Sequence, residues 1–370
     1  MQPYDYIIIG AGSAGCVLAN RLSEDPAVRV LLLEAGPRDW HPFIHMPAGL
    51  AKLVNRKGVN WDYDTAPEPQ LDGRRLWWPR GKVLGGSSSI NAMCYVRGVP
   101  ADYDGWAAVA PGWDWATVLP YFRRAEGNSR GADALHGGDG PLAVSDLRHH
   151  NPLSEVFIAA ANQAGIGSNH DFNGPGQAGV GLYQVTQRDG ARCSAAVAYL
   201  APARRRPNLT VHTGAMVERI AFDGRRASGV RYALRGSPAQ ARAAREVILC
   251  GGTINSPQTL MLSGIGPADE LRRLGIDVLH DAPGVGGNLQ DHLDICTLRH
   301  ATRPITYDRI NEPKMAFDYY LRGHRGAGSS NIAEAGGFWR SPLAQDGRCD
   351  VQFHFVPAML DDHGRHRLPG

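Results

Sequence analysis

The N-terminal part of the chain alternates apolar runs with one amphipathic stretch. Tyr4–Ile9 is aromatic and β-branched, which predicts a buried strand. From Ser13 to Leu22 the apolar residues recur on one face of a helix, and Val28–Leu33 is a second short apolar run. Because a fully apolar run is typical of a strand in a parallel sheet, this pattern predicts a βαβ unit.

The next regular elements are spaced more widely. Residues 37–80 are rich in proline, tryptophan and charge, and predict a long excursion rather than regular layers. Asn151-Pro152 is a typical helix start, and the helix should run over Leu153–Ala164 until Gly165 stops it.

The second half of the chain predicts more strands than helices. Leu209–Phe222 and Gly229–Leu234 are expected to pair through a turn at Asp223-Gly224. Arg245–Cys250 is a short strand that should return the chain to the first sheet. The remaining apolar segments are a short helix over Pro267–Leu274, and Phe317–Leu321 and Val351–Val356.

A glycine pattern joins the first strand to the first helix. Gly10, Gly12 and Gly15 form GxGxxG, and Glu34 follows Gly15 by 19 residues at the end of the second strand. These glycines allow a tight turn, close approach of a pyrophosphate and close helix–strand packing, while the acid binds a ribose. A glycine-rich turn without a ligand is the structural alternative. The motif predicts a dinucleotide but does not distinguish FAD from NAD.

The stretch over residues 80–104 carries the most specific pattern. Gly85, Gly86 and the three serines that follow have almost no side-chain bulk, so their backbone N–H groups can lie against a flat ligand. Ile90 and Asn91 follow at once. A generic Gly/Ser loop is the alternative, but such loops lack the ordered apolar and asparagine positions.

This stretch resembles the first signature of the glucose-methanol-choline (GMC) oxidoreductases, where it lines the flavin ring of FAD. Gly252–Gly266 resembles the second signature, with Thr259 at a position that is usually aliphatic. Residues 283–292 resemble a downstream family motif, in which we interpret His292 as structural rather than catalytic. The nearest branch resembles bacterial choline dehydrogenases and related alcohol dehydrogenases.

The resemblance implies a set of cofactor contacts along the chain. FAD should be bound without a covalent bond, because Asn91 stands where covalently flavinylated relatives have histidine. The expected cofactor-binding residues are Gly10, Gly12, Ser13, Ala14, Gly15, Glu34, Ala35, Trp61, Arg80, Gly81, Val83, Gly85, Gly86, Ser87, Asn91, Ala92, Met93, Cys94, Val96, Val217, Gly251 and Ser256.

Two residues are candidates for contact with the substrate. By resemblance, Glu334 aligns with an acid near the substrate cation, and His354 with a histidine that binds the alcohol oxygen. The alternatives are a capped buried carboxylate for Glu334 and a core-facing strand histidine for His354. Trp61 and Tyr319 could cage a quaternary ammonium, although such residues are more often packing.

The main catalytic base of the family is a histidine in a C-terminal motif, and no residue up to Gly370 matches that motif. We therefore expect the chain to be a fragment or a truncation, nearly inactive by itself.

Composition adds mainly exclusions. Of 370 residues 45 are glycine, more than the roughly 7% that is usual. The net charge of +3 gives no argument for nucleic acid. The six cysteines include no CxxC pair, so we predict no metal site and a reducing, cytoplasmic compartment. No apolar run is long enough to span a membrane, which leaves peripheral association open.

Together these patterns predict an α/β fold. A Rossmann-like FAD-binding domain should comprise residues 1–150 and 192–295, and a second α+β substrate-binding domain residues 151–191 and 296–370, incomplete at the C-terminus. The predicted reaction is oxidation of a primary, choline-like alcohol to an aldehyde by hydride transfer to flavin N5. The acceptor would be oxygen or a quinone-type carrier. The alternatives are a truncated FAD-binding module and an FAD-containing cyanohydrin lyase.

Overall fold

The computed structural model describes residues 2–361 and 365–368. The chain divides into two compact units. The first unit comprises Met1–Trp40, Asn55–Ile90 and Ser194–Cys296, and the second comprises His41–Val54, Asn91–Cys193 and Thr297–Gly370. Residues 41–54 and 91–150, expected in the FAD-binding domain, thus group with the second unit. Which function each unit carries stays a prediction.

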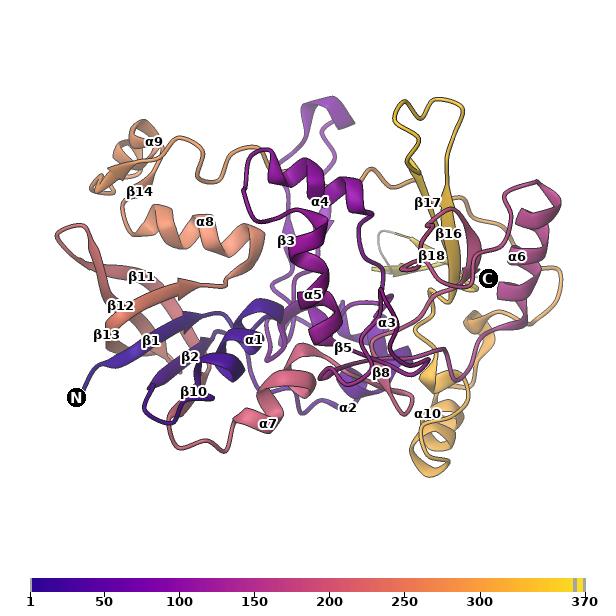
Figure 1. The fold of residues 1–370 in the computed structure, drawn as a ribbon, viewed down its shortest axis with the longest axis horizontal. Coiled ribbons are helices and arrows are strands. Elements are labelled where there is room, and N and C mark those ends of the chain that lie inside the picture. The colour runs from indigo at the N-terminus through magenta and orange to yellow at the C-terminus, as the bar shows by residue number, and fades with distance from the viewer. Residues whose placement is uncertain (1, 362–364, 369–370) are drawn as a thin grey trace. The chain divides into compact units, whose positions relative to one another are not determined.

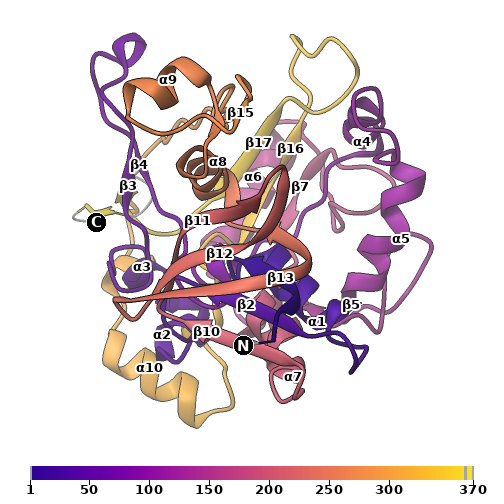
Figure 2. The same cartoon turned by 90° about the vertical axis from the view of Figure 1, so that its left-hand side faces the viewer.

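The first unit contains a six-stranded sheet (Figures 1 and 2). In spatial order its strands are β10 (Leu209–Thr213), β2 (Val30–Glu34), β1 (Tyr4–Ile9), β13 (Ser237–Leu249), β12 (Arg226–Leu234) and β11 (Ala215–Asp223). The first four are parallel where they pair, and the last two continue as an antiparallel extension of β13. The predicted βαβ unit and α/β class are confirmed.

The prediction of a single strand over Leu209–Phe222 is wrong. The segment forms two strands, because Gly214 turns the chain with φ +66°. The first part, β10, joins the parallel sheet beside β2, and the second part, β11, forms the hairpin with β12. The predicted turn at Asp223-Gly224 closes that hairpin.

The core of the first unit lies against the sheet. Ile7, Ile9, Leu31 and Leu33 are buried together with side chains from β11 and β12. Fully burying one such side chain stabilises the fold by about 1.5–3 kcal/mol. The other elements of this unit are α1 (Ser13–Leu22), β3 (Tyr63–Asp64), η2 (Pro69–Leu71), β4 (Trp77–Trp78), η3 (Gly86–Ser89), the π-helix η4 (Ala196–Leu200), α7 (Ala201–Ala203), α8 (Gly252–Leu262), β14 (Ile265–Gly266), α9 (Ala268–Arg273) and β15 (His280–Asp281).

The second unit is built on a smaller antiparallel sheet with the order β17 (Val351–Phe355), β16 (Ala335–Trp339) and β7 (Gly179–Leu182). Helix α6 (Pro152–Gln163) begins after Asn151, whose side chain caps it, and packs on β7 and β16 (Figure 1). The other elements are α2 (Pro42–His45), η1 (Pro47–Gly49), α3 (Leu50–Leu53), α4 (Pro100–Ala107), α5 (Trp115–Ala125), β5 (Glu126–Asn128), β6 (Leu142–Val144), β8 (Gln187–Arg188), β9 (Ala191–Arg192), η5 (Tyr307–Arg309), α10 (Glu312–Leu321), η6 (Ala327–Ser329), β18 (Leu360–Asp361) and β19 (His366–Arg367).

A buried polar cluster fixes the irregular part of the second unit. The carboxylate of Glu126, fully buried, accepts from Arg97 Nη2 at 2.5 Å and from the Gly137 N–H at 2.9 Å. It also lies 3.0 Å from His136 Nδ1 and accepts from Asn128 Nδ2 at 2.9 Å. We call these residues the Glu126 cluster. They tie together loops that have little regular structure of their own.

Within the described ranges, no helix is long and apolar enough to cross a membrane. Nor do the described His, Cys, Asp and Glu side chains gather into a group of three that could hold a metal ion.

Candidate functional site

The loop between β1 and α1 leaves a helix N-terminus open. Helix α1 is ten residues long, and no described side chain caps it. Ser13 and Ala14, its first residues, are exposed. The unpaired N–H groups of a first turn and the helix dipole favour an anion at this place. The structure therefore presents at α1 the feature that a pyrophosphate needs.

The three glycines of this loop are required for different reasons. Gly10 has φ +96°, and a Cβ on it would lie 2.5 Å from Cys250 O. A Cβ on Gly15 would lie 1.9 Å from Gly10 O, so packing excludes it. A Cβ built on Gly12 meets no described atom within 4 Å, and its backbone is extended. The protein itself does not explain Gly12, whereas close approach of a ligand does.

Glu34 is the last residue of β2, and its carboxylate is hydrogen-bonded to this loop. Its carboxylate accepts from Ala11 N at 2.9 Å and from Gly36 N at 2.8 Å, and the side chain is buried. Burial raises the pKa of the Glu34 carboxyl to about 7, against the lowering effect of both N–H groups and of Lys82. Each oxygen keeps a second lone-pair site, so the ionised group can also accept from ribose hydroxyls.

The glycine-serine stretch packs directly on the nucleotide loop. Gly85 N donates to Ala11 O at 2.7 Å, and a Cβ on Gly86 would lie 2.7 Å from Gly12 Cα. Gly85 and Gly86 have φ +89° and +55°, which favours glycine. The two glycine motifs, 70 residues apart in sequence, form one continuous backbone surface in the first unit. Because the two backbones are in direct contact here, they suit the close approach of a flat dinucleotide.

Aromatic side chains lie beside the glycine-serine stretch. The rings of Trp61 and Tyr63 stack at 5.7 Å, and Lys82 Nζ lies 4.6 Å from the Trp61 ring centre. The Tyr63 hydroxyl donates to Asn255 Oδ1 at 2.5 Å. Trp61 was predicted here, whereas Tyr63, Lys82 and Asn255 were not. Lys82 and Asn255 could have been found, since each belongs to a segment that resembles one of the two family signatures.

The other predicted residues of the first unit are distributed over loops, the sheet and α8. Arg80 N donates to Asn60 Oδ1 at 2.8 Å, and Gly81 N donates to Ser87 Oγ at 3.1 Å. Ala35 follows β2, Val83 is fully buried, Val217 lies on β11, Gly251 precedes α8 and Ser256 lies within it.

The predicted residues Asn91 to Cys94 belong to the second unit, where Asn331 holds them. Asn331 is fully buried, and its Nδ2 donates to Ala92 O at 2.8 Å and to Cys94 Sγ at 3.3 Å. No described atom donates to its Oδ1. Met93 has φ +60°, which costs free energy in a residue with a side chain. Strain beside an orphaned polar atom is typical of a ligand site.

The neighbouring residues of this segment are fixed by other contacts. Asn91 Oδ1 accepts from Met93 N at 3.1 Å and from Arg192 Nη1 at 2.9 Å. Val96 packs on the cluster formed by Phe172 and Tyr183.

Glu334 lies in a cage of hydrogen-bond donors. It accepts from Asn151 N at 2.7 Å, Ser154 Oγ at 2.7 Å and Ser330 Oγ at 2.5 Å, and also from the Tyr307 hydroxyl. The side chain has no exposed surface. This geometry supports the capped-carboxylate alternative, because four donors already bind the two oxygens. A role for Glu334 beside a substrate cation stays a prediction.

His354 is exposed on β17. Its ring stacks on Tyr183 at 5.3 Å, and its backbone pairs with Gly336. The alternative of a core-facing histidine is therefore wrong, while the predicted contact with an alcohol oxygen stays untested. His292 is exposed, and its backbone N–H donates to Asp291 Oδ1 at 2.8 Å. Tyr319 is fully buried and serves packing rather than a cage, with its hydroxyl 3.2 Å from two carbonyl oxygens.

Comparison with known proteins gives consistent similarities. Residues 4–294 match the family model described as GMC oxidoreductase. The chain is 50% identical to an alcohol dehydrogenase [acceptor] of Pseudomonas putida and 50% identical to mitochondrial choline dehydrogenase of Homo sapiens, over 98% of its own length in each case. It spans 67% and 63% of those two relatives.

Solved structures extend this similarity to the fold. Pyridoxine 4-oxidase from Mesorbium loti superposes with a TM-score of 0.81 at 34% identity, covering 96% of this chain and 67% of that one. A variant of formate oxidase from Aspergillus oryzae superposes with a TM-score of 0.83 at 27% identity, covering 97% of this chain and 69% of that one.

Proposed function

The chain belongs to the GMC oxidoreductase family, and from that premise we propose that it takes part in the FAD-dependent oxidation of a primary alcohol to an aldehyde. FAD is the cofactor that this membership supports. The single observation that carries the proposal is the continuous backbone surface formed by the GxGxxG loop and Gly85-Gly86. A surface formed largely by glycine backbone, ending at an open helix N-terminus, suits a dinucleotide with a planar ring.

Different residues would bind the different parts of FAD. The N–H groups at the start of α1 would hold the pyrophosphate, Glu34 the ribose, and the backbone around Gly86 the ring. When bound, the flavin supplies the redox chemistry by accepting the hydride of the alcohol carbon. In this proposal the protein's own task is to orient the alcohol and to receive the hydroxyl proton.

His354 is our candidate for binding the alcohol oxygen. Its imidazole is exposed and stacks on the Tyr183 ring, so it lies where a ligand can reach it. An imidazole can exchange both a proton and a hydrogen bond with an alcohol oxygen near neutral pH. A choline-like or other primary alcohol leads the substrate list, since relatives at 50% identity carry the names choline dehydrogenase and alcohol dehydrogenase. Those names favour the oxidoreductase over the cyanohydrin lyase. For the acceptor we keep oxygen or a quinone-type carrier.

Anaerobic titration with alcohols tests the function. FAD-loaded protein should lose its visible flavin absorption when a primary alcohol is added, because the electrons remain on the cofactor. Admitting oxygen or adding a soluble quinone afterwards should restore the colour, and the faster of the two identifies the acceptor class. Yellow protein that no alcohol bleaches, but that cleaves a cyanohydrin, would favour the lyase. Protein that stays colourless after incubation with FAD would contradict every flavin-dependent role.

The raised pKa of Glu34 predicts a pH dependence of FAD affinity. Ribose hydroxyls donate to the ionised carboxylate, and its ionised fraction rises as the pH passes through the pKa of about 7. If only the ionised form binds, the affinity should rise about tenfold between roughly pH 6 and pH 8. Fluorescence quenching of free FAD measures it. Glu34→Gln should bind more weakly and lose this dependence. A wild-type affinity that is flat or falls with pH would contradict the assignment.

A further inference from the structure

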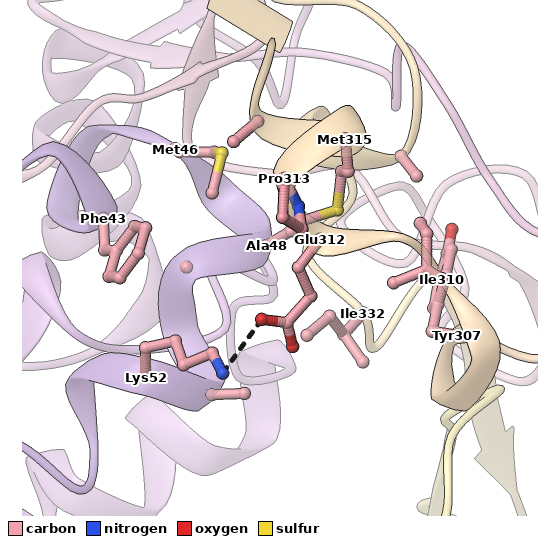
Figure 3. Close-up of a pocket in the computed structure, with 14 residues that line it drawn as sticks. Phe43, Met46, Ala48, Lys52, Tyr307, Ile310, Glu312, Pro313, Met315 and Ile332 are labelled. Atoms are coloured by element: carbon pink, nitrogen blue, oxygen red, sulfur yellow. Dashed lines mark ion pairs between the residues drawn. The ribbon is translucent and has the colours of Figure 1, made fainter. Parts of the chain in front are cut away.

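A cavity of about 270 Å³ lies within the second unit (Figure 3). One wall comes from the short helices between Phe43 and Lys52, and the other from the start of α10. Phe43 and Met46 face Pro313 and Met315 across it, and Ile310 and Ile332 extend the second wall. Small residues complete the lining, among them Ala51 and Ala316.

The lining is apolar apart from one ion pair and the Tyr307 hydroxyl. Lys52 Nζ lies 3.0 Å from a carboxylate oxygen of Glu312, and both side chains are more than one third exposed. These are the charged groups among the described lining residues, and they neutralise each other. The cavity thus offers no uncompensated carboxylate to a cation. Placing an unpaired cation among apolar side chains is strongly unfavourable.

Backbone strain marks the same cavity. Ile332 has φ +70°, a conformation that is a genuine outlier for a β-branched residue. Tyr307, another lining residue, donates its hydroxyl to Glu334, the predicted substrate-side carboxylate. Because strained residues persist at ligand sites when the surroundings impose them, the outlier indicates a functional cavity rather than a chance defect in packing.

We propose that this cavity binds the hydrocarbon body of an uncharged, unbranched alcohol. An apolar cavity of about 150 Å³ already takes up benzene, and at roughly 30 Å³ for each non-hydrogen atom this one holds about nine. The unbranched thioether chains of Met46 and Met315 can adapt to a flexible chain. The alcohol identity rests on the proposed function, whereas the preference for an uncharged chain rests on the lining alone.

Filling the cavity tests the proposal. Calorimetry on the FAD-loaded protein should detect binding of 1-octanol, and Ala316→Phe should weaken it by at least about tenfold, because several buried methylenes are displaced. Ala51→Phe on the opposite wall should act alike, so the conclusion does not depend on one variant. Ala159→Phe, on an exposed position of α6, is the matched control and should bind octanol as the wild type does. Choline binding, where detected, should not change in Ala316→Phe.

Two outcomes would overturn the proposal: octanol binding unchanged in both filled variants that fold, or equal loss in Ala159→Phe. Flavin bleaching separates this result from the proposed function. If octanol binds in the cavity but no alcohol bleaches the flavin, the function fails and the site stands. If alcohols bleach the flavin while the filled variants bind octanol normally, the function stands and the site fails.

Discussion

Replacing Arg97 with methionine is expected to lower the free energy of unfolding by about 3–5 kcal/mol, the cost of leaving a buried charge without its partner. The guanidinium and the Glu126 carboxylate are 2% and 0% exposed. Methionine fills similar volume, so the change removes charge and hydrogen bonds rather than packing. Urea denaturation followed by circular dichroism measures the loss as a lower midpoint.

The size of this effect follows from the cluster around the pair. The Arg97 guanidinium also donates to Leu135 O at 2.7 Å. The backbone N–H of Arg97 donates to Asn173 Oδ1 at 2.6 Å. Without the guanidinium, Glu126 keeps the Gly137 N–H, the Asn128 amide and the His136 ring as neighbours. It loses the permanent positive charge of Arg97, which offsets its desolvation. Local opening of the loops would follow.

Two further variants decide whether charge is the cause. The double variant Arg97→Met with Glu126→Leu should be more stable than Arg97→Met alone, because no buried charge then remains unpaired. Arg130→Met breaks an exposed pair with Asp146 and should cost only about 0–1 kcal/mol. A loss in Arg97→Met no larger than in Arg130→Met would contradict the assigned role of the cluster.

Local patterns predicted the regular elements of this fold, whereas the pairing of the strands could be seen only in the structure. Tyr4–Ile9 and Ser13–Leu22 have the predicted bounds, because burial and helical periodicity are both local signals. Strand β13 was predicted only at its C-terminal end, since its first half is largely exposed and contains no large apolar residue. Strands β10 and β11 could not be separated, because only the left-handed conformation of Gly214 divides an otherwise continuous β-type pattern.

The residues of the candidate site could also be predicted in part, whereas their contacts could not. The two glycine motifs were visible in the sequence, but their contact was not, since nothing local says that Gly86 packs on Gly12. Arg97 belongs to the first signature stretch, yet its partner Glu126 gave no signal of its own. The sequence left open whether His354 faces the core or a ligand, and only the register of β17 shows that it is exposed. Contacts between distant segments are the information that a single sequence lacks.

Gly12→Ser is expected to separate cofactor binding from folding. A Cβ here meets no described atom within 4 Å, and the backbone, at φ −75° and ψ −163°, is that of an ordinary N-cap residue. Serine is a better N-cap than glycine because its hydroxyl accepts from the first free N–H groups of the helix. The apo protein should therefore keep its stability or gain a few tenths of a kcal/mol.

The same substitution should weaken FAD binding by about tenfold to a hundredfold. The new side chain occupies the space in which the pyrophosphate approaches and binds the N–H groups that the phosphate needs, and crowding of this kind costs ~1–3 kcal/mol. Gly15→Ala is the contrasting variant, because its Cβ would lie 1.9 Å from Gly10 O and should destabilise the apo protein itself. Gly58→Ser, on an exposed turn, controls for the substitution. Thermal unfolding and FAD titration of all three variants decide the matter: an unchanged FAD affinity in Gly12→Ser would remove the pyrophosphate from the α1 N-terminus.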